Sequence, residues 1–283
     1  ADWWNQVHQS RAVAAYVAHA KDYSRQERKV MIAQARQYNA DLAQKALLNT
    51  TENENDRWVM TEAEKRYYDS TLDITGSGVM GYVTIPSIAV RLPIYHGTDA
   101  GVLQVATGHI PGSSLPVGGD STHAVVSGHT GLPSAKLFTG LDKLKKGDTF
   151  AFHVLDRTYT YQVDQIRTVL PKDLSQLDIE PGRDYATLVT CTPYGVNTHR
   201  LLVRGHRIPN PKTADTTDYD ARIRLTGAII ITATVLAIAA IAWWLVTSTR
   251  RYLAEKHDEV AAADGAVAVM NNDQRRHAKE WRK

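Results

Sequence analysis

The run Thr187-Leu-Val-Thr-Cys-Thr-Pro-Tyr-Gly-Val-Asn-Thr-His-Arg-Leu-Leu-Val-Arg-Gly205 holds the only cysteine of the chain, Cys191, between two short apolar runs. We predict strands at 186–190 and 201–203, because Val, Leu and Thr dominate both runs. The proline, glycine and asparagine between them are turn residues, so the two strands should form an antiparallel hairpin. Such a hairpin brings Cys191 close to Arg200 at its mouth. A thiol beside a permanent cation at a strand end indicates a nucleophile.

Taken alone, Cys191 favours packing over catalysis, since a lone cysteine in a long chain is more often a small buried hydrophobic residue than a nucleophile. The flanking sequence argues for catalysis. The run TLVTCTPYGVNTHRLLVRGHR closely resembles the signature of the sortases, which are cysteine transpeptidases of Gram-positive cell surfaces. Its TPYG and NTHRLLVRG portions resemble the pilus-assembling class C. The resemblance implies that Cys191 is the nucleophile and that Arg200 stabilises the oxyanion or the substrate.

A second segment, Val125-Val-Ser-Gly-His-Thr-Gly-Leu-Pro133, supports the same resemblance. A predicted strand runs into this segment, and the glycines on both sides of His129 suggest a turn that exposes the imidazole. Spacing alone would also nominate His199, which adjoins Arg200 in the hairpin. SGHTG is similar to the catalytic histidine segment of sortases, and this similarity selects His129 as the general acid and base.

The central part of the chain, residues 76–208, is predicted to be a β domain. Short β-branched and aromatic runs alternate with proline and glycine there, which is typical of a barrel or sandwich. GYVTIPSIAVRLPIYHGT resembles the opening strands of the sortase barrel. The predicted fold class is therefore mainly β: a sortase-type closed β-barrel with N-terminal helices and a C-terminal transmembrane helix. One helix is expected between strands, at 135–144.

The N-terminal region, residues 1–48, is expected to be helical, because it lacks proline and glycine and spaces apolar residues at helical intervals. Residues 49–75 are a candidate lid loop with a short helix. The segment Asp56-Arg57-Trp58 resembles the Asp-Pro-aromatic motif of the class C lid, with arginine in place of proline. Asp56 and Trp58 are thus lid candidates, since an aspartate pairs with a catalytic cation and a ring fills a groove. The alternative is a surface loop with one packed tryptophan.

The C-terminal part begins with a polar linker at 209–224. Residues 225–248 follow without a charged residue. At about 1.5 Å per residue this run is about 36 Å long, which exceeds a hydrocarbon core of roughly 30 Å, so we expect a transmembrane helix. Basic residues are nearly balanced around it and leave the orientation open. The class C resemblance implies that the barrel lies outside the cell and the tail, 249–283, in the cytoplasm.

Bulk composition limits the partners. The 283 residues include 33 basic and 30 acidic side chains, and this formal net charge of +3 is too weak to indicate nucleic acid binding. A single cysteine excludes an intrachain disulfide and any multi-cysteine zinc site. No metal-ligand spacing is visible, and we expect no cofactor.

The family resemblance also implies the reaction. Sortases cleave an LPXTG-like sorting signal between Thr and Gly and retain the acyl part as a thioester. In class C a lysine of another pilin resolves the thioester as an isopeptide bond, so the expected partners are pilin subunits and the lipid bilayer. Three alternatives remain open: a housekeeping-type sortase that anchors proteins to peptidoglycan, a non-catalytic membrane-tethered binding domain, and a thiol hydrolase of another fold.

Overall fold

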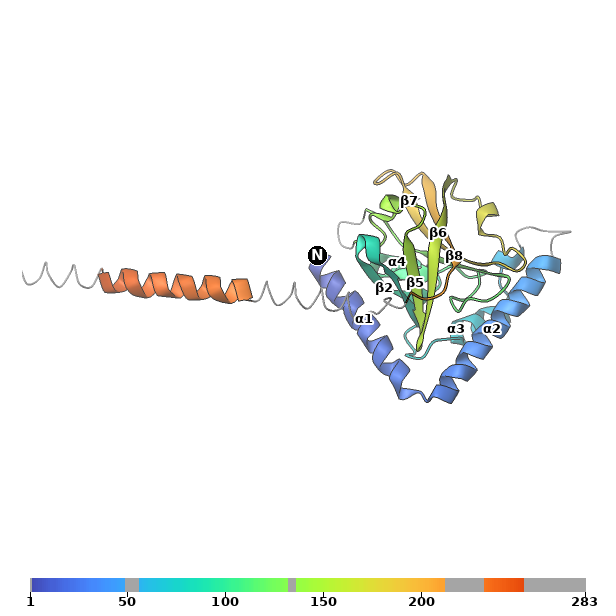
Figure 1. The fold of residues 1–283 in the computed structure, drawn as a ribbon, viewed down its shortest axis with the longest axis horizontal. Helices are drawn as coiled ribbons and strands as arrows, with labels where there is room; N and C mark the ends of the chain where they lie inside the picture. Colours follow the sequence, from blue (N-terminus) through green and yellow to red (C-terminus); the bar gives the residue numbers. More distant parts are fainter. Residues whose placement is uncertain (1, 49–55, 132–135, 212–231, 252–283) are drawn as a thin grey trace, which may run out of the picture. The chain divides into compact units, whose positions relative to one another are not determined.

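The computed structural model describes residues 2–48, 56–131, 136–211 and 232–251. The chain divides into two structural units, residues 1–215 and 216–283. The first unit contains a closed β-barrel with helices beside it, and the second contains one apolar helix (Figure 1). The predicted mainly β fold class is confirmed.

Eight strands form the barrel in the described residues: β1 (Val79–Ile85), β2 (Val90–His96), β3 (Thr107–His109), β4 (Thr122–Ser127), β5 (Thr149–Val154), β6 (Arg157–Val169), β7 (Asp184–Thr192) and β8 (His199–Arg207). They close in the order β1-β2-β3-β4-β7-β8-β6-β5. The β2–β3 and β4–β7 pairs are parallel, and the other six neighbouring pairs of the barrel are antiparallel. Strands that pair in parallel need a long connection between them, and β5 and β6 lie within the connection from β4 to β7.

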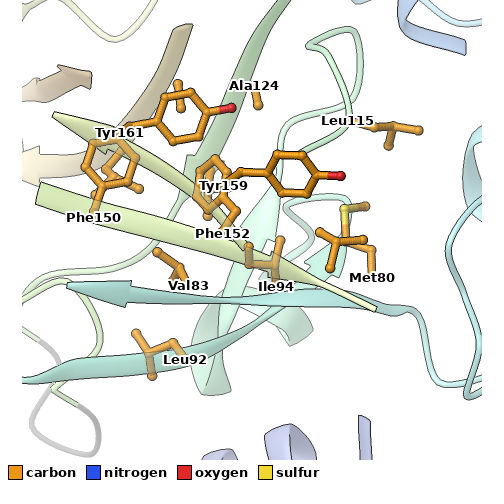
Figure 2. Close-up of a cluster of buried hydrophobic side chains, with 14 of the residues drawn as sticks. Met80, Val83, Leu92, Ile94, Leu115, Ala124, Phe150, Phe152, Tyr159 and Tyr161 are labelled. Carbon is orange, nitrogen blue, oxygen red and sulfur yellow. The ribbon is translucent and has the colours of Figure 1, made fainter. Parts of the chain in front are cut away.

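Aromatic side chains of β5 and β6 fill the barrel. Phe150, Phe152, Tyr159 and Tyr161 gather between the strands (Figure 2), and each is at most 5% exposed. They occupy alternate positions of their strands, so their side chains point to the same face of the sheet. The rings of Phe150 and Tyr161 stack with centroids 5.6 Å apart. This packed interior makes the barrel a rigid support for its rim.

Four α-helices accompany the barrel: α1 (Asp2–Asp22), α2 (Arg25–Leu48), α3 (Glu62–Ser70) and α4 (Ala100–Val105). The region expected to be helical is thus two helices, α1 and α2, which meet at an angle beside the barrel (Figure 1). A capping box begins α2, since Ser24 N donates to Glu27 Oε2 at 2.7 Å and Glu27 N donates to Ser24 Oγ at 3.2 Å. Arg28 Nη1 donates to Ala20 O at 2.9 Å and so satisfies the end of α1.

The prediction of a helix over 135–144 is wrong for residues 136–144, the part of that stretch that the structure describes. Only Leu141–Lys143 forms a short 3₁₀ helix. Gly140 takes φ 98°, a left-handed conformation that interrupts helical geometry. Leu137, Phe138 and Leu141 are all buried in the barrel cluster, so core packing decides the local conformation.

The C-terminal helix of the described residues is Thr232–Arg251, which is 20 residues long and has a mean hydropathy of 1.6. Its length of about 30 Å matches a bilayer core, so it is long and apolar enough to cross a membrane. The predicted span of 225–248 starts earlier, and its residues 225–231 lie outside the described residues. The tail predicted at 249–283 is described only as far as residue 251.

Helix α1 is joined to the barrel through one buried hydroxyl. Tyr16 Oη donates to Met80 O at 3.0 Å and accepts from Leu155 N at 2.9 Å. The ring packs with Val13, Val79 and Tyr82, and Tyr16 is 0% exposed. The bonds connect α1 to strand β1 and to the end of the β5 hairpin, so this hydroxyl fixes the helix against two elements.

Replacing Tyr16 with phenylalanine should lower the free energy of unfolding by about 1–3 kcal/mol, because a buried N–H and a buried carbonyl lose their partner. Tyr23→Phe is the matched control, since its hydroxyl makes only a long bond of 3.4 Å to Ile74 O. Urea unfolding of the full chain in detergent, monitored by tryptophan fluorescence, measures the free energy of unfolding of each variant. Equal losses in the two variants would contradict this account of how α1 is held.

Candidate active site

The β7–β8 hairpin carries two of the three predicted catalytic residues. Cys191, near the end of β7, lies directly opposite Arg200, near the start of β8. Residues opposite each other in an antiparallel pair face the same side of the sheet. The thiol and the guanidinium therefore share one face, and both residues are partly exposed. The expected closeness of these two residues at the mouth of the hairpin is confirmed.

The hairpin loop orients Arg200. Its Nη1 donates to Asn197 O at 3.3 Å and to His199 O at 3.1 Å. Among the described residues its hydrogen-bond partners are these two backbone carbonyls. The positive charge is held in place without a paired carboxylate, which leaves it available to an oxygen that becomes negative during a reaction.

His129 follows directly from strand β4. That strand runs parallel to β7 with Ser127 paired to Val189, and Gly128 N donates to Val189 O at 3.0 Å. Gly128 O accepts from Thr190 Oγ1 at 2.7 Å. Residue 128 must be glycine, because an added Cβ would lie 2.9 Å from the Phe138 ring. Two hydrogen bonds thus direct the chain so that His129 comes after β4 at the level where Cys191 follows Thr190.

The strand order sets which residue stands in the middle. Strand β7 lies between β4 and β8 in the barrel. Cys191 is therefore flanked by His129 on one side and Arg200 on the other, at the same end of three neighbouring strands. In such an arrangement the thiol in the middle can attack a carbonyl, the imidazole can move a proton, and the cation can stabilise an oxyanion.

The segment Asp56–Trp58 forms a single 3₁₀ turn, and its middle residue is anchored to the barrel. The Arg57 guanidinium donates through Nη2 to Asp178 Oδ1 at 2.7 Å and to Leu177 O at 3.2 Å. Arg57 is 7% exposed, and burial lowers the pKa of its guanidinium while the Asp178 carboxylate offsets part of that effect. Because a buried cation needs a partner, this bond fixes the segment to the β6–β7 loop.

Trp58 lies on the face of β7 that carries Cys191. It packs against an apolar cluster of Val125, Leu177, Val189 and Leu202, which come from β4, the β6–β7 loop, β7 and β8. Val189 is two residues before Cys191, so the two share one face of β7. Gly112 allows the close approach, since an added Cβ would lie 2.9 Å from the indole of Trp58. The side chain of Asp56, the other lid candidate, lies outside what the structure describes.

Known proteins match this arrangement. The sortase domain family matches residues 83–208. Sortase C1 from Streptococcus agalactiae is 52% identical, with a TM-score of 0.65 and coverage of 71% of this chain and 100% of that chain. The chain belongs to the sortase family. Several solved relatives of this sortase are sortases of class C. They include Streptococcus pneumoniae sortase C, which is 41% identical with a TM-score of 0.60 and coverage of 71% and 97%.

Two further relatives extend the comparison. Sortase C from Clostridium perfringens, solved with the C-terminal cell wall sorting motif, is 39% identical to this sortase, with a TM-score of 0.59 and coverage of 71% and 100%. Sortase A from Streptococcus agalactiae is 33% identical over 128 residues, which are 44% of this chain and 51% of that protein. The chain thus spans about half the length of that curated relative.

Sequence reasoning missed the role of Arg57 in this sortase. The motif comparison singled out the residues on either side of it and treated the arginine as a departure from the pattern. Its partner, Asp178, is separated from it by 121 positions, so no local signal links the two. Among the described residues no group of three or more His, Cys, Asp or Glu side chains is arranged to hold a metal ion.

A buried histidine supports the β4–β7 pair from the side of the β6–β7 loop. His123 Nδ1 is 2.8 Å from Asp178 O, and its Nε2 is 2.7 Å from Thr187 Oγ1. A carbonyl only accepts, so Nδ1 carries the proton and Nε2 accepts from the hydroxyl. Burial lowers the pKa of His123 to about 4, so the imidazole is neutral at physiological pH.

Acid should destabilise this sortase through His123. Below pH 6.5 the unfolded chain takes up a proton at this imidazole, whereas the folded chain does so only near pH 4. The free energy of unfolding should therefore fall by about 3 kcal/mol as the pH drops from 6.5 to 4. Urea unfolding of the full chain across this range measures the slope.

The variant His123→Gln should show a shallower slope than the wild type. His19→Gln is the control, because that histidine side chain is 55% exposed on α1 and should leave the slope unchanged. Identical slopes in the wild type and His123→Gln would refute the assignment of acid sensitivity to this buried ring.

Proposed function

We propose that this sortase is a membrane-anchored cysteine transpeptidase that cleaves an LPXTG-like sorting signal between Thr and Gly and joins pilin subunits through a lysine isopeptide bond. The observation that supports the proposal is the strand order with its register: Cys191 on β7 pairs with Arg200 on β8, and the neighbouring strand β4 ends two residues before His129. Two relatives support the substrate class. The Streptococcus pneumoniae structure concerns pilin substrate specificity, and the Clostridium perfringens structure contains the C-terminal cell wall sorting motif.

The first half of the reaction forms the thioester. The Cys191 sulfur attacks the carbonyl carbon of the signal threonine, and the carbonyl oxygen becomes an oxyanion. Arg200 donates to this oxygen from a position that the loop backbone has already set. His129, which has taken the proton of the Cys191 thiol, gives it to the departing glycine nitrogen, and the C–N bond breaks. Arginine cannot act as the base, since it stays charged.

The second half transfers the acyl group to an amine. A lysine nitrogen of another pilin attacks the thioester carbon, His129 takes a proton from that nitrogen, and the C–S bond breaks. The same imidazole serves both halves because the incoming amine takes the place of the departing one. Cysteine and histidine return to their starting states, so the cycle repeats with each added subunit.

The apolar helix Thr232–Arg251 supports membrane anchoring. In this proposal the barrel is extracellular and the tail is cytoplasmic. Pilin precursors held in the same membrane would meet the enzyme at a raised effective concentration without any additional contact. The polar linker of 209–224 would let the barrel reach them.

We further propose that Asp56 and Trp58 belong to a lid over the site. Trp58 already packs on the face that carries Cys191, and Arg57 anchors the turn to the β6–β7 loop through Asp178. An indole in that position would occupy space that a sorting signal needs. Opening the lid would break the bond between the buried Arg57 guanidinium and the Asp178 carboxylate, whose side chain is 67% exposed. Closure is the resting state in this proposal.

A housekeeping sortase is the second candidate function, favoured by the 33% identity to sortase A. The two functions share the thioester and differ in the amine that resolves it. A peptidoglycan amine would replace the pilin lysine. Comparing the two amines as acceptors for one preformed thioester separates the two functions.

The catalytic assignment predicts an acyl-enzyme at one residue. Incubation of the full chain with an LPXTG-type peptide should give a mass increase on Cys191 that corresponds to the peptide up to its threonine. Cys191→Ala should give none. His129→Ala should slow cleavage by about 10²–10⁴-fold, because general acid and base catalysis is lost.

His199→Ala is the matched control, since this histidine adjoins Arg200 in the same hairpin and has no assigned role. The cleavage rate of His199→Ala should stay within about threefold of the wild-type rate, which is a far smaller change than the loss of general acid and base catalysis causes. A larger loss in His199→Ala than in His129→Ala would reverse the assignment of the two histidines. A mass increase that persists in Cys191→Ala would exclude the thioester.

The lid predicts faster access to the thiol when its residues are removed. Alanine at Asp56 and Trp58, or at Arg57, should raise the rates of Cys191 alkylation and of peptide cleavage by about tenfold, as expected when about 1.4 kcal/mol of closure is lost. Val59→Ala is the control, because Val59 adjoins the turn and is 69% exposed. Rates equal to those of the wild type in the lid variants would show that Trp58 is merely a packed surface residue.

A further inference from the structure

An exposed aromatic ring stands beside the histidine side of the active site. Tyr194 lies at the tip of the β7–β8 hairpin and is 68% exposed. One edge of its ring faces Gly131, where an added Cβ would lie 3.1 Å from Tyr194 Cε2. Gly131 comes two residues after His129. The ring therefore extends from the loop that follows the nucleophile to the segment that carries the acid and base.

Both sides of this contact are held by backbone geometry. Val196 N and Asn197 N each donate to Pro193 O at 3.0 Å, so the hairpin tip is a closed turn that projects Tyr194 outward. Gly131 takes φ +76°, and its N donates to Thr139 Oγ1 at 3.1 Å. A large ring that a rigid turn holds in solvent contributes little to the core. Because the ring stays exposed beside the candidate catalytic residues, a ligand that reaches them from this side can contact it.

The chemistry identifies which ligand approaches from this side. His129 must protonate the departing amine and deprotonate the incoming one, so the amine site lies on the His129 side of Cys191. The oxyanion lies on the Arg200 side. The ring of Tyr194 contacts the His129 segment, which places it beside the amine rather than beside the acyl group.

We propose that Tyr194 recognises the acceptor lysine in the second half of the reaction, an inference that rests on the proposed function. A ring face attracts an ammonium group, and its apolar surface packs against the methylene stem of a lysine. The contact would guide the lysine nitrogen along the ring to the thioester beside His129. Water and small amines lack the stem and would gain little from it.

The step balances without any further reactant. The lysine ammonium first releases one proton to solvent. The neutral nitrogen then attacks the thioester carbon, a C–N bond forms and the C–S bond breaks. The remaining excess proton on nitrogen passes to His129 and from there to the Cys191 thiolate. Tyr194 exchanges no proton in this scheme, and its ring alone carries the effect.

The test measures how one thioester divides between two nucleophiles. The full chain in detergent micelles receives an LPXTG-type peptide together with a single-lysine peptide and hydroxylamine, and mass analysis quantifies the two products. Both products arise from the same thioester, so their ratio is independent of how fast the thioester forms and of the lid. Tyr194→Ala should lower the ratio of lysine product to hydroxylamine product by about fivefold, as expected for an exposed cation–ring contact.

Two variants control for the loop. Tyr194→Phe keeps the ring and should keep the ratio within about twofold, as should Val196→Ala, which removes another exposed side chain of the same turn (63% exposed). The apparent KM for the lysine peptide should rise in Tyr194→Ala, while the rate with hydroxylamine should stay at the wild-type level.

Three results would overturn the inference. An unchanged product ratio in Tyr194→Ala excludes a role in acceptor recognition. An equal fall of both products shows that the residue merely supports the loop. A lowered ratio of lysine product to hydroxylamine product in Tyr194→Phe shows that the hydroxyl, and not the ring, is responsible. Absence of any thioester on wild-type Cys191 would instead remove the proposed function, and this inference with it.

Discussion

The parallel pairing of β4 with β7 is the constraint on which the site depends. It joins two segments that the β5–β6 hairpin separates along the chain, with partners running from Thr122 opposite Asp184 to Ser127 opposite Val189. A slip of one residue would turn Cys191 to the opposite face of the sheet, because side chains alternate along a strand. Gly128, the residue after β4, is hydrogen-bonded to Val189 and Thr190 of β7. These bonds extend the pairing beyond the end of β4 and position the next residue, His129.

The rest of the barrel keeps that register from shifting. The aromatic interior of β5 and β6 is densely packed, and sites built on rigid strands hold their geometry better than sites built on loops. Helix α2 is tied to the chain before β4 by Asn39, whose amide donates to Leu115 O at 3.1 Å and accepts from Leu115 N at 2.7 Å. Helices and barrel thus act together to hold the three candidate catalytic residues at one end of neighbouring strands.

The β6–β7 loop is where the Asp56–Trp58 turn meets the barrel. Asp178 accepts a hydrogen bond from Arg57 through its carboxylate and one from His123 through its backbone carbonyl, so one residue connects the Asp56–Trp58 turn to the β4–β7 pair. Arg57 is therefore a buried charge whose partner, the Asp178 side chain, is 67% exposed. A buried charge that loses its partner is strongly unfavourable, so the bond to Asp178 holds the turn against the β6–β7 loop as long as Arg57 stays buried.

The sequence by itself determined the hairpin, the β-rich composition of the barrel, the apolar C-terminal run and, through resemblance, the histidine segment. These features are local: the separation of Cys191 from Arg200 is short, and turn residues with alternating strands suffice to bring them together. The tertiary structure alone decided the strand order, the union of Arg57 with Asp178 and the contact of Tyr194 with Gly131. It also replaced the expected helix at 135–144 by turns in the part it describes, because buried side chains outweighed local propensity. Each of these depends on closing long loops around a shared core, and no short run of residues encodes where a distant partner will lie.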